Sequence, residues 1–257
     1  MKRAIKACWD RPRGKAMKLF NALSFAEDRI LLEQLRLVMS NFRSTLIAIV
    51  MPPLLYWALA NPSNSTTLAW WSVAAVLSNL NLQFYGMRKL ASPMALTQAR
   101  PTAFTLTVFN LLEGLIWGLL PWLVIGSVNW AGLVLVVAVF TGMLGGGLAT
   151  QSPVPLLYIA FAMPQTLMIA SKLWFLGDNS YQILSFATVI YFISLFGQAK
   201  NSARVTRSAI EVRFELADSH AKLRAIEHKQ TLEQERQRLM QDMHDGLGSS
   251  LISALRV

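Results

Sequence analysis

The chain has 257 residues, of which 54% are hydrophobic and only 15% are charged, and its mean hydropathy is +0.40. About a quarter of the residues in a soluble domain are charged, so this composition excludes an ordinary soluble protein and predicts an all-α membrane protein in a lipid bilayer. The formal net charge of +10 would indicate nucleic-acid binding in a soluble protein. Here it is better explained by where Lys and Arg lie relative to a membrane, and we expect no direct contact with nucleic acid.

Residues 1–42 form a basic segment that is expected to lie in the cytoplasm. It does not resemble a cleavable signal, because charges in EDRILLEQLR interrupt the apolar core that a signal needs. Residues 16–40 alternate apolar and charged positions at roughly helical spacing. Two arrangements fit this pattern: a helix lying on the cytoplasmic leaflet, or a polar helix packed on the membrane bundle. Cys8 is the only cysteine, so we expect neither an intrachain disulfide nor a cysteine metal site.

Residues 43–198 are predicted to form a membrane sensor domain with six transmembrane helices, because six hydrophobic windows are long enough to cross ~30 Å of hydrocarbon. Pro52-Pro53 and Pro164 lie inside two windows, where proline kinks are more tolerable than in soluble helices. The motif GMLGG at 142–146 has small-xxx-small spacing, which predicts a tight helix contact. The windows are 43–60, 67–85, 103–124, 130–150, 154–174 and 181–198.

The distribution of Lys and Arg predicts the orientation of these spans. Basic residues are dense from Lys2 to Arg43, before the first window, whereas the loops on the opposite side hold Lys172 alone. The positive-inside rule therefore places both termini in the cytoplasm. The other basic residues on the cytoplasmic side are Arg88, Lys89 and Arg100 after the second window and Lys200, Arg204 and Arg207 after the last.

Glu113, in FNLLEGLIWGLL, lies close to the middle of the third window. Ionisable residues at that depth are costly and indicate a functional site by default. Asn110 and Trp117 lie on the same helix face, three positions before it and four after it, and the three residues predict a polar pocket for a signal molecule or a cation. The alternative is a protonated Glu113 hydrogen-bonded to another span. Its candidate partners are Asn79, Asn81 and Gln165.

Residues 199–230 change abruptly to a charged composition and are predicted to form a dimeric coiled-coil signalling helix. Their apolar residues step by alternating fours and threes, which is the a/d seam of a coiled coil. A second stripe from Leu232 to Leu251 is shifted in phase, as a stutter would shift it. We expect a parallel homodimer, with His220 and His228 at solvated positions rather than in a metal site. The seam comprises Val205, Ala209, Val212, Leu216, Ser219, Leu223 and Ile226.

Residues 231–257 carry ERQRLMQDMHDGLGSSLISAL, which resembles the first phosphoacceptor helix of the NarX/DesK-type sensor histidine kinases. The pattern of that family is roughly E-R-x-R-[IL]-x-x-[ED]-[LM]-H-D-G-[LV]-G-[QGS]-x-L, and the chain matches it at the required spacing from Glu235 to Leu251. The resemblance implies that His244 is the phosphoacceptor and Asp245 the orienting base. An imidazole nitrogen is the nucleophile that this phosphoryl transfer needs, and a carboxylate on the other ring nitrogen fixes its tautomer. Helix spacing alone does not pair adjacent side chains, so the resemblance carries the role of Asp245.

The resemblance also implies cofactors and a partner. ATP and Mg²⁺ would be bound by a domain that we expect to lie outside this chain, and the phosphoryl group would pass to a NarL-type response regulator in a bacterium, at its cytoplasmic membrane. Many family members have Gln or His five residues after the phosphoacceptor, where this chain has Ser249, which predicts weak dephosphorylation of the partner. The alternative is that Ser250 or a bound water takes over this role. Gly246 and Gly248 predict a bendable helix beside the histidine, with a helix stop as the alternative.

Two other classes of protein fit the sequence. One is a non-catalytic membrane receptor or anchor that dimerises through its coiled coil. The other is a small transporter whose intramembrane Glu113 carries protons.

Overall fold

The computed structural model describes residues 27–42, 48–92 and 95–254, with the side chains of the last stretch described to Met240 and at Met243. Every regular element among these residues is helical and none is a strand, which confirms the predicted all-α class. The chain divides into two compact units, Met1–Ser208 and Ala209–Val257. We call them the membrane unit and the C-terminal unit.

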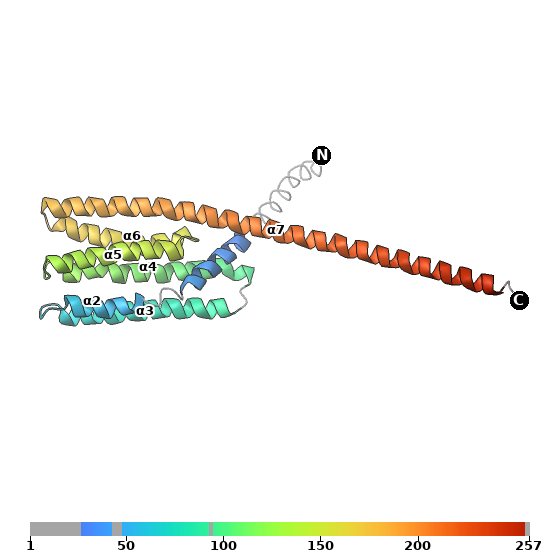
Figure 1. The fold of residues 1–257 in the computed structure, drawn as a ribbon. Coiled ribbons are helices and arrows are strands. Elements are labelled where there is room, and N and C mark those ends of the chain that lie inside the picture. The colour runs from blue at the N-terminus through green and yellow to red at the C-terminus, as the bar shows by residue number, and fades with distance from the viewer. Residues whose placement is uncertain (1–26, 43–47, 93–94, 255–257) are drawn as a thin grey trace, which may run out of the picture. The chain divides into compact units, whose positions relative to one another are not determined.

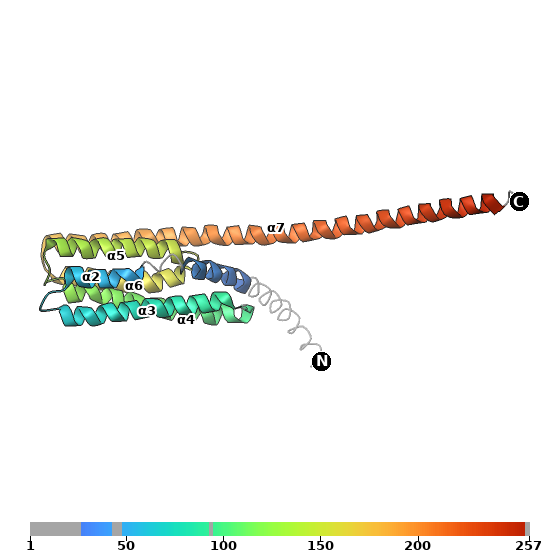
Figure 2. The same ribbon diagram turned by 60° about the horizontal axis from the view of Figure 1, so that its bottom comes forward.

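The membrane unit is a bundle of antiparallel helices that run side by side in both ribbon views (Figures 1 and 2). A helix at residues 27–41 precedes the bundle, and the short 3-10 helix η2 lies between two of the bundle helices. The elements are α2 (Met51–Leu59), α3 (Ser65–Ala91), η2 (Leu96–Gln98), α4 (Ala99–Val124), α5 (Trp130–Gln151), α6 (Pro155–Phe175) and α7 (Asn179–Ala254), the last of which continues into the C-terminal unit.

Four helices are long and apolar enough to cross a membrane, which indicates a membrane protein. They are Leu96–Val124, Trp130–Gln151, Pro155–Phe175 and Asn179–Met240. The first two of the six predicted windows do not reach this standard. The apolar helix of the first window covers only Ala48–Leu59, and residues 43–47 lie outside the described part of the chain. Helix α3 has 27 residues, but amide side chains and a basic last turn make it less apolar.

The prolines of the apolar helices occupy two kinds of position, the first turn and the helix interior. Pro52 lies in the first turn of α2, where backbone N–H groups have no partner within the helix, so its missing N–H costs no hydrogen bond. Pro121 and Pro164 lie inside α4 and α6. Pro164 is therefore interior to its helix, whereas Pro52 and Pro53 lie in the first turn of α2 and within the apolar stretch Ala48–Leu59.

The helix at residues 27–41 packs on the bundle. Its apolar face is buried, Asn41 donates to the carbonyl oxygen of Thr150 at 3.3 Å, and Arg100 of α4 pairs with Asp28 at 2.7 Å. The packed alternative is therefore correct for these residues, while 16–26 lie outside the described part. The core cluster beneath this helix comprises Leu32, Leu35, Val38, Met39, Phe42, Leu82, Ala99, Leu106, Val154 and Leu157.

Helix α4 is the central helix of the bundle and is held closely on two sides. On one side, Gly114 lies against the backbone of α6 so closely that a Cβ atom there would overlap the carbonyl oxygen of Phe161. On the other side, the indole N–H of Trp71 in α3 donates to the carbonyl oxygen of Ile116 at 2.7 Å. The ring of Trp71 also meets Trp117 edge-on at 5.2 Å between centroids. These contacts orient the face of α4 that carries Glu113.

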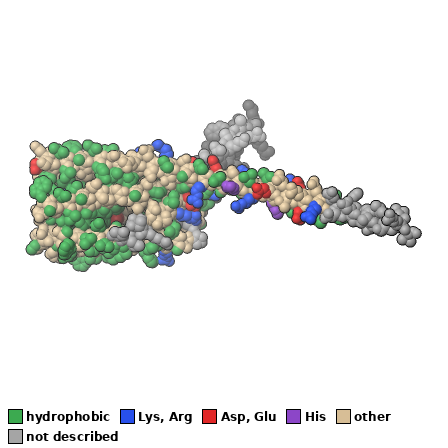
Figure 3. Space-filling view, in the orientation of Figure 1, with side chains coloured by type: hydrophobic (Ala, Val, Ile, Leu, Met, Phe, Trp, Pro, Cys, Tyr) green, Lys and Arg blue, Asp and Glu red, His purple; other side chains and the backbone are tan. Residues whose placement is uncertain are grey.

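The surface of the membrane unit divides by chemistry. Hydrophobic side chains cover most of the face shown in Figure 3, as expected of a surface that contacts lipid. The basic residues Arg88 and Lys89 close α3 at the end where α4 begins with Arg100. At the opposite end of α4, the ammonium group of Lys172 lies 5.2 Å from the centre of the Trp122 ring, a cation–π contact.

The C-terminal unit is a single stretch of α7. The helix continues through Gly246 and Gly248 to Ala254, so a helix stop at these glycines is wrong. His220 and His228 are exposed. The large apolar side chains of the predicted seam and of the second stripe are also exposed, by between 55% and 63%. In this unit they are Val212, Leu216, Leu223 and Ile226 of the seam and Leu232, Leu239 and Met243 of the second stripe.

Candidate functional site

Glu113 is buried in the middle of α4, with 2% of its surface exposed. Its carboxyl oxygen Oε1 accepts a hydrogen bond from the indole N–H of Trp117 at 3.1 Å and a longer one from the amide of Asn79 at 3.5 Å. Its Oε2 makes no well-formed hydrogen bond in the described part of the chain, and the Ser78 hydroxyl is the donor that lies close to the carboxyl group. Helices α3 and α4 therefore share this carboxyl group between them.

The polar contact extends from Glu113 along α3. The amide nitrogen of Gln83 donates to the Oδ1 of Asn79 at 2.7 Å, and Asn79 in turn donates to Glu113. Gln83 is buried and its own Oε1 has no partner among the described residues. The result is a short chain of side-chain hydrogen bonds that links α3 to the carboxyl group of α4.

Asn110 belongs to a second polar pair. Its amide nitrogen donates to the carbonyl oxygen of Leu106 at 2.8 Å, and its Oδ1 accepts from the amide of Gln151 in α5 at 2.7 Å. The predicted face of α4 is thus correct, since Asn110, Glu113 and Trp117 are all buried on it. Asn110, however, is bonded to α5 and not to the carboxyl group.

These side chains line one cavity of about 650 Å³. The predicted residues Asn110, Glu113 and Trp117 all belong to its wall; that it binds a signal molecule stays a prediction. Small residues of α5 form another part of the wall and keep the space open. The remaining residues of the wall include Phe42, Met51, Leu82, Ala138, Gly142, Met143, Gly146, Ala149 and Phe161.

The glycines of the GMLGG motif have a different role from the one predicted. A Cβ atom on Gly142 or Gly146 would have nothing within 4 Å, so neither glycine makes a tight helix contact. The close contact falls on the next glycine, Gly147, whose Cβ atom would lie 2.9 Å from the ring of Phe161. Gly142 and Gly146 instead line the cavity beside Glu113.

The three alternative partners of Glu113 are now distinguished. Asn79 contacts the carboxyl group, as one of the candidates was expected to do. Asn81 lies on an exposed groove of α3, and Gln165 donates to the carbonyl oxygen of Phe161 in its own helix. The sequence analysis missed Gln83 and Gln151. The sequence signal for both residues is a long amide side chain at the end of an apolar window. Gln83 lies near the end of window 67–85, and Gln151 directly follows window 130–150.

His244, Asp245 and Ser249 lie in the last turns of α7. The backbone there is helical, as the resemblance implies, and the side chains of these three residues are outside the described part. Within the described part, no group of three or more His, Cys, Asp or Glu residues is arranged to hold a metal ion.

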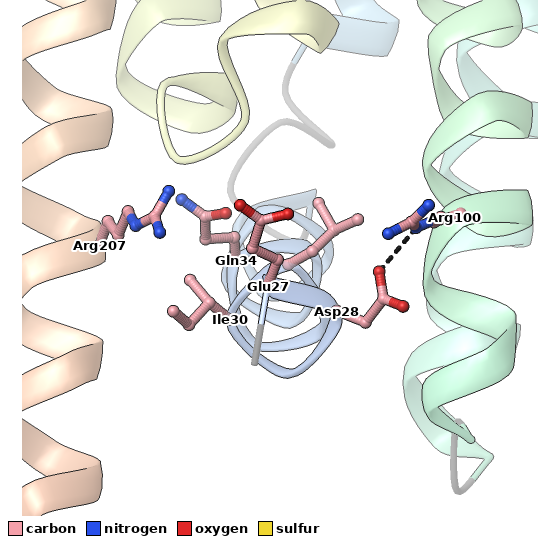
Figure 4. A pocket seen from close by; sticks show the side chains of 7 residues that line it. Glu27, Asp28, Ile30, Gln34, Arg100 and Arg207 are labelled. Carbon is pink, nitrogen blue, oxygen red and sulfur yellow. Dashed lines mark hydrogen bonds and ion pairs between the residues drawn. The ribbon is translucent and has the colours of Figure 1, made fainter. Parts of the chain in front are cut away.

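A second, charged cavity of about 240 Å³ lies where the helix at 27–41 faces α4 and the part of α7 in the membrane unit (Figure 4). Asp28 points to Arg100 of α4, while Glu27 and Gln34 lie on the side of the helix that faces Arg207 of α7. Charged side chains from three elements therefore meet at the basic end of the bundle.

In comparisons with known proteins, no family model, no curated protein and no solved structure matches the chain. A functional assignment therefore depends on the residues themselves. Two features carry it: the pattern from Glu235 to Leu251 and the polar cavity beside Glu113.

Proposed function

We propose that this chain is the membrane sensor and first phosphoacceptor helix of a NarX/DesK-type histidine kinase in a bacterial two-component system. The observation that carries the proposal is the pattern from Glu235 to Leu251, which includes His244 and Asp245. It lies on α7, a continuous helix of 76 residues that begins in the apolar membrane unit. A membrane unit with an internal cavity, followed by a long helix, supports a receptor that passes a signal along that helix.

The proposed chemistry is phosphoryl transfer in two steps. A ring nitrogen of His244 attacks the γ-phosphorus of ATP, the bond to the β-phosphate oxygen breaks, and ADP leaves. The carboxylate of Asp245 holds the other ring N–H and stabilises the positive charge that develops on the ring. An Asp of a NarL-type response regulator then takes the phosphoryl group. ATP and Mg²⁺ are supplied by the ATP-binding domain that this family uses.

The proposed topology has six spans, with both termini in the cytoplasm. The basic end of the bundle, with Arg88, Lys89 and Arg100, supports the assignment of that end to the cytoplasm. Lys172 at the other end is a lone cation whose charge rests on an aromatic ring, as expected at a membrane interface.

The proposed functional state is a parallel homodimer through α7. Exposed apolar side chains at a/d spacing, such as Leu216 and Leu223, support a second copy as the partner, because that copy presents the same seam. A long helix with no packing partner is unstable in water, and pairing would bury this stripe.

Helix α7 is the least buried of the four helices that are long and apolar enough to cross a membrane, which supports a role for it as the moving element. Its contacts with the bundle include a stacked pair of Tyr181 with Trp130 and an edge-on pair of Phe186 with Trp174. Ser185 donates to the carbonyl oxygen of Ala170 at 2.8 Å, and the hydroxyl groups of Ser202 and Ser152 are 2.9 Å apart. Leu195 and Ala199 are its buried apolar residues in this region. A change in the bundle would shift or rotate α7 at little cost and so change the exposure of His244.

The test is phosphorylation of the chain when an ATP-binding domain of this family is supplied, fused or in trans. We expect acid-labile, base-stable label from γ-phosphate-labelled ATP in the wild type and none in His244→Gln. The exposed residues His220 and His228 offer matched controls, and His220→Gln and His228→Gln should both retain the label. Label that persists in His244→Gln would overturn the proposal.

The second candidate function is a small transporter, and the observation that favours it is the buried carboxyl group beside a cavity. Substitution separates the two, and also separates the non-catalytic anchor. His244→Ala abolishes signalling in a kinase but leaves an anchor or a transporter intact. Glu113→Gln abolishes proton-coupled transport into vesicles if the chain is a transporter.

A further inference from the structure

The hydrogen bonds that end on Glu113 have a definite direction. The indole nitrogen of Trp117 can only donate, so the Oε1 atom of Glu113 is an acceptor. Asn79 presents its NH₂ group to the same oxygen and its Oδ1 to Gln83, which is the arrangement that an ionised carboxylate requires. Gln83 consequently uses its nitrogen, and its Oε1 is the atom that has no partner in the described part of the chain.

The second polar pair has the same direction. The main-chain carbonyl oxygen of Leu106 can only accept, which assigns the NH₂ group of Asn110 to it. Gln151 therefore donates to Asn110 Oδ1 through its nitrogen. Its Oε1 is again the atom without a partner among the described residues.

Both groups of hydrogen-bonded side chains therefore leave acceptor oxygens without a partner, on residues that line the same cavity. The three atoms are Oε2 of Glu113 and the Oε1 atoms of Gln83 and Gln151, and each residue is more than nine-tenths buried. Each donor nitrogen of these side chains already donates a hydrogen bond. Buried acceptors without partners destabilise a fold, so these oxygens favour a partner that donates hydrogen bonds.

The size and the other walls of the cavity indicate how large this partner is. A volume of about 650 Å³ fits a small organic molecule, since such sites occupy roughly 300–1,000 Å³. A bare alkali or alkaline-earth ion would leave most of it empty and would need oxygen ligands on all sides. Phe42, Met51 and Phe161 are instead apolar, and Gly142 and Gly146 offer a smooth surface for an apolar body.

We propose that this cavity binds a lipophilic amine in its ammonium form, with the N–H groups directed to Glu113 and the apolar body along α5. An ammonium group has three donors and no acceptor, which matches the unused oxygens, and its charge balances a carboxylate at a depth where an isolated charge is costly. In the structure the unused oxygens are closed off from water, so the proposal requires the carboxyl group to turn toward the cavity on binding. That the amine is the signal rests on the proposed function; that it binds does not.

The experiment measures binding to the full chain in lipid nanodiscs. The probes are three radiolabelled primary amines of different shape: 1-aminoadamantane, 2-phenylethylamine and octylamine. Each is compared with the neutral alcohol of the same skeleton, which partitions into lipid but carries no charge. We expect at least one amine to bind saturably, with its alcohol weaker by about tenfold or more because the charge-assisted hydrogen bond is lost. An alcohol that binds as tightly as its amine, or no saturable binding by any amine, would overturn the proposal.

Two variants locate the site within the chain. Glu113→Gln keeps the shape of the side chain and should weaken amine binding by about tenfold or more while leaving alcohol binding unchanged. Gly146→Leu should abolish binding because its side chain fills the cavity. The matched control is Gly197→Leu, since Gly197 is also a helical glycine with open space beside it but lies outside the cavity wall.

The outcome is independent of phosphorylation. His244→Gln should bind the amine as the wild type does, whatever its effect on kinase activity. If the amine binds and His244 is never phosphorylated, the binding site stands and the kinase proposal fails. If Glu113→Gln or Gly146→Leu binds as tightly as the wild type, the site is wrong.

Discussion

The two units carry their functional residues in opposite ways. In the membrane unit, Glu113 acquires its surroundings from α3, α4 and α5, so its environment exists only because several helices pack together. In the C-terminal unit, the seam and the motif around His244 lie on one helix and depend on spacing alone. The first kind of site is therefore formed within one copy of the chain, whereas the second, in the dimeric kinase that we propose, would act only with a partner surface.

The largest expected effect concerns the site around His244, whose residues follow one another along a single helix. If spacing along α7 sets the chemistry, replacing Ser249 with a residue that reaches further should speed loss of phosphate from the response regulator. A misplacement of about 1 Å costs ~100-fold in such reactions, so Ser249→Gln in a reconstituted kinase should recover a large part of that factor. Phosphorylation of His244 itself should not change.

The matched variant is Ser250→Gln, which places the same side chain one position further along the helix. It should leave the dephosphorylation rate at the wild-type level. Equal rates for Ser249→Gln and the wild type would show that Ser249 does not limit this activity.

The next effect concerns the packed unit. Gly114→Ala places a methyl group against the backbone of α6 and should destabilise the membrane unit by about 1–3 kcal/mol, as overpacking does. Gly142→Ala adds the same group to open space and should stabilise the helix by about 0.4–1 kcal/mol, because alanine has less backbone freedom to lose on folding. Thermal unfolding in detergent measures both. A stability loss of equal size in the two variants would contradict the packing of α4 on α6.

A smaller effect should distinguish the faces of the C-terminal helix. In a Cys8→Ser background, Leu216→Cys and Leu223→Cys should form disulfide-linked dimers in membranes, because the seam brings like positions together. Arg213→Cys and Lys222→Cys lie off the seam and should link several-fold less. Non-reducing gels give the yields. Equal linking at all four positions would show that this seam is not the dimer contact.

The difference between the units also explains what the sequence could predict. Helical periodicity was enough to place Asn110, Glu113 and Trp117 on one buried face, because that relation lies within one helix. Gln83 and Gln151 could not be assigned to the site, because their positions depend on how α3 and α5 pack against α4.

Small residues were misinterpreted for the same reason. A glycine with small-xxx-small spacing permits a close contact, but only the packed bundle shows whether a neighbour uses the space. Gly142 and Gly146 leave it empty, while Gly114, outside any such motif, makes the closest approach. Helix α3 is a separate case. Its amide side chains lower its hydropathy, so it is not among the helices apolar enough to cross a membrane despite its length.

We expect the cavity beside Glu113 to control phosphorylation of His244 through α7. The most direct measurement is the initial rate of His244 labelling in nanodiscs, with the ATP-binding domain supplied, for wild type, Gly146→Leu and Gly197→Leu. A filled cavity should hold the bundle in one state, so Gly146→Leu should change the rate by about fivefold or more, as a coupling free energy of 1–3 kcal/mol implies, while Gly197→Leu matches the wild type. Identical rates in all three proteins, with Gly146→Leu folded, would contradict the account.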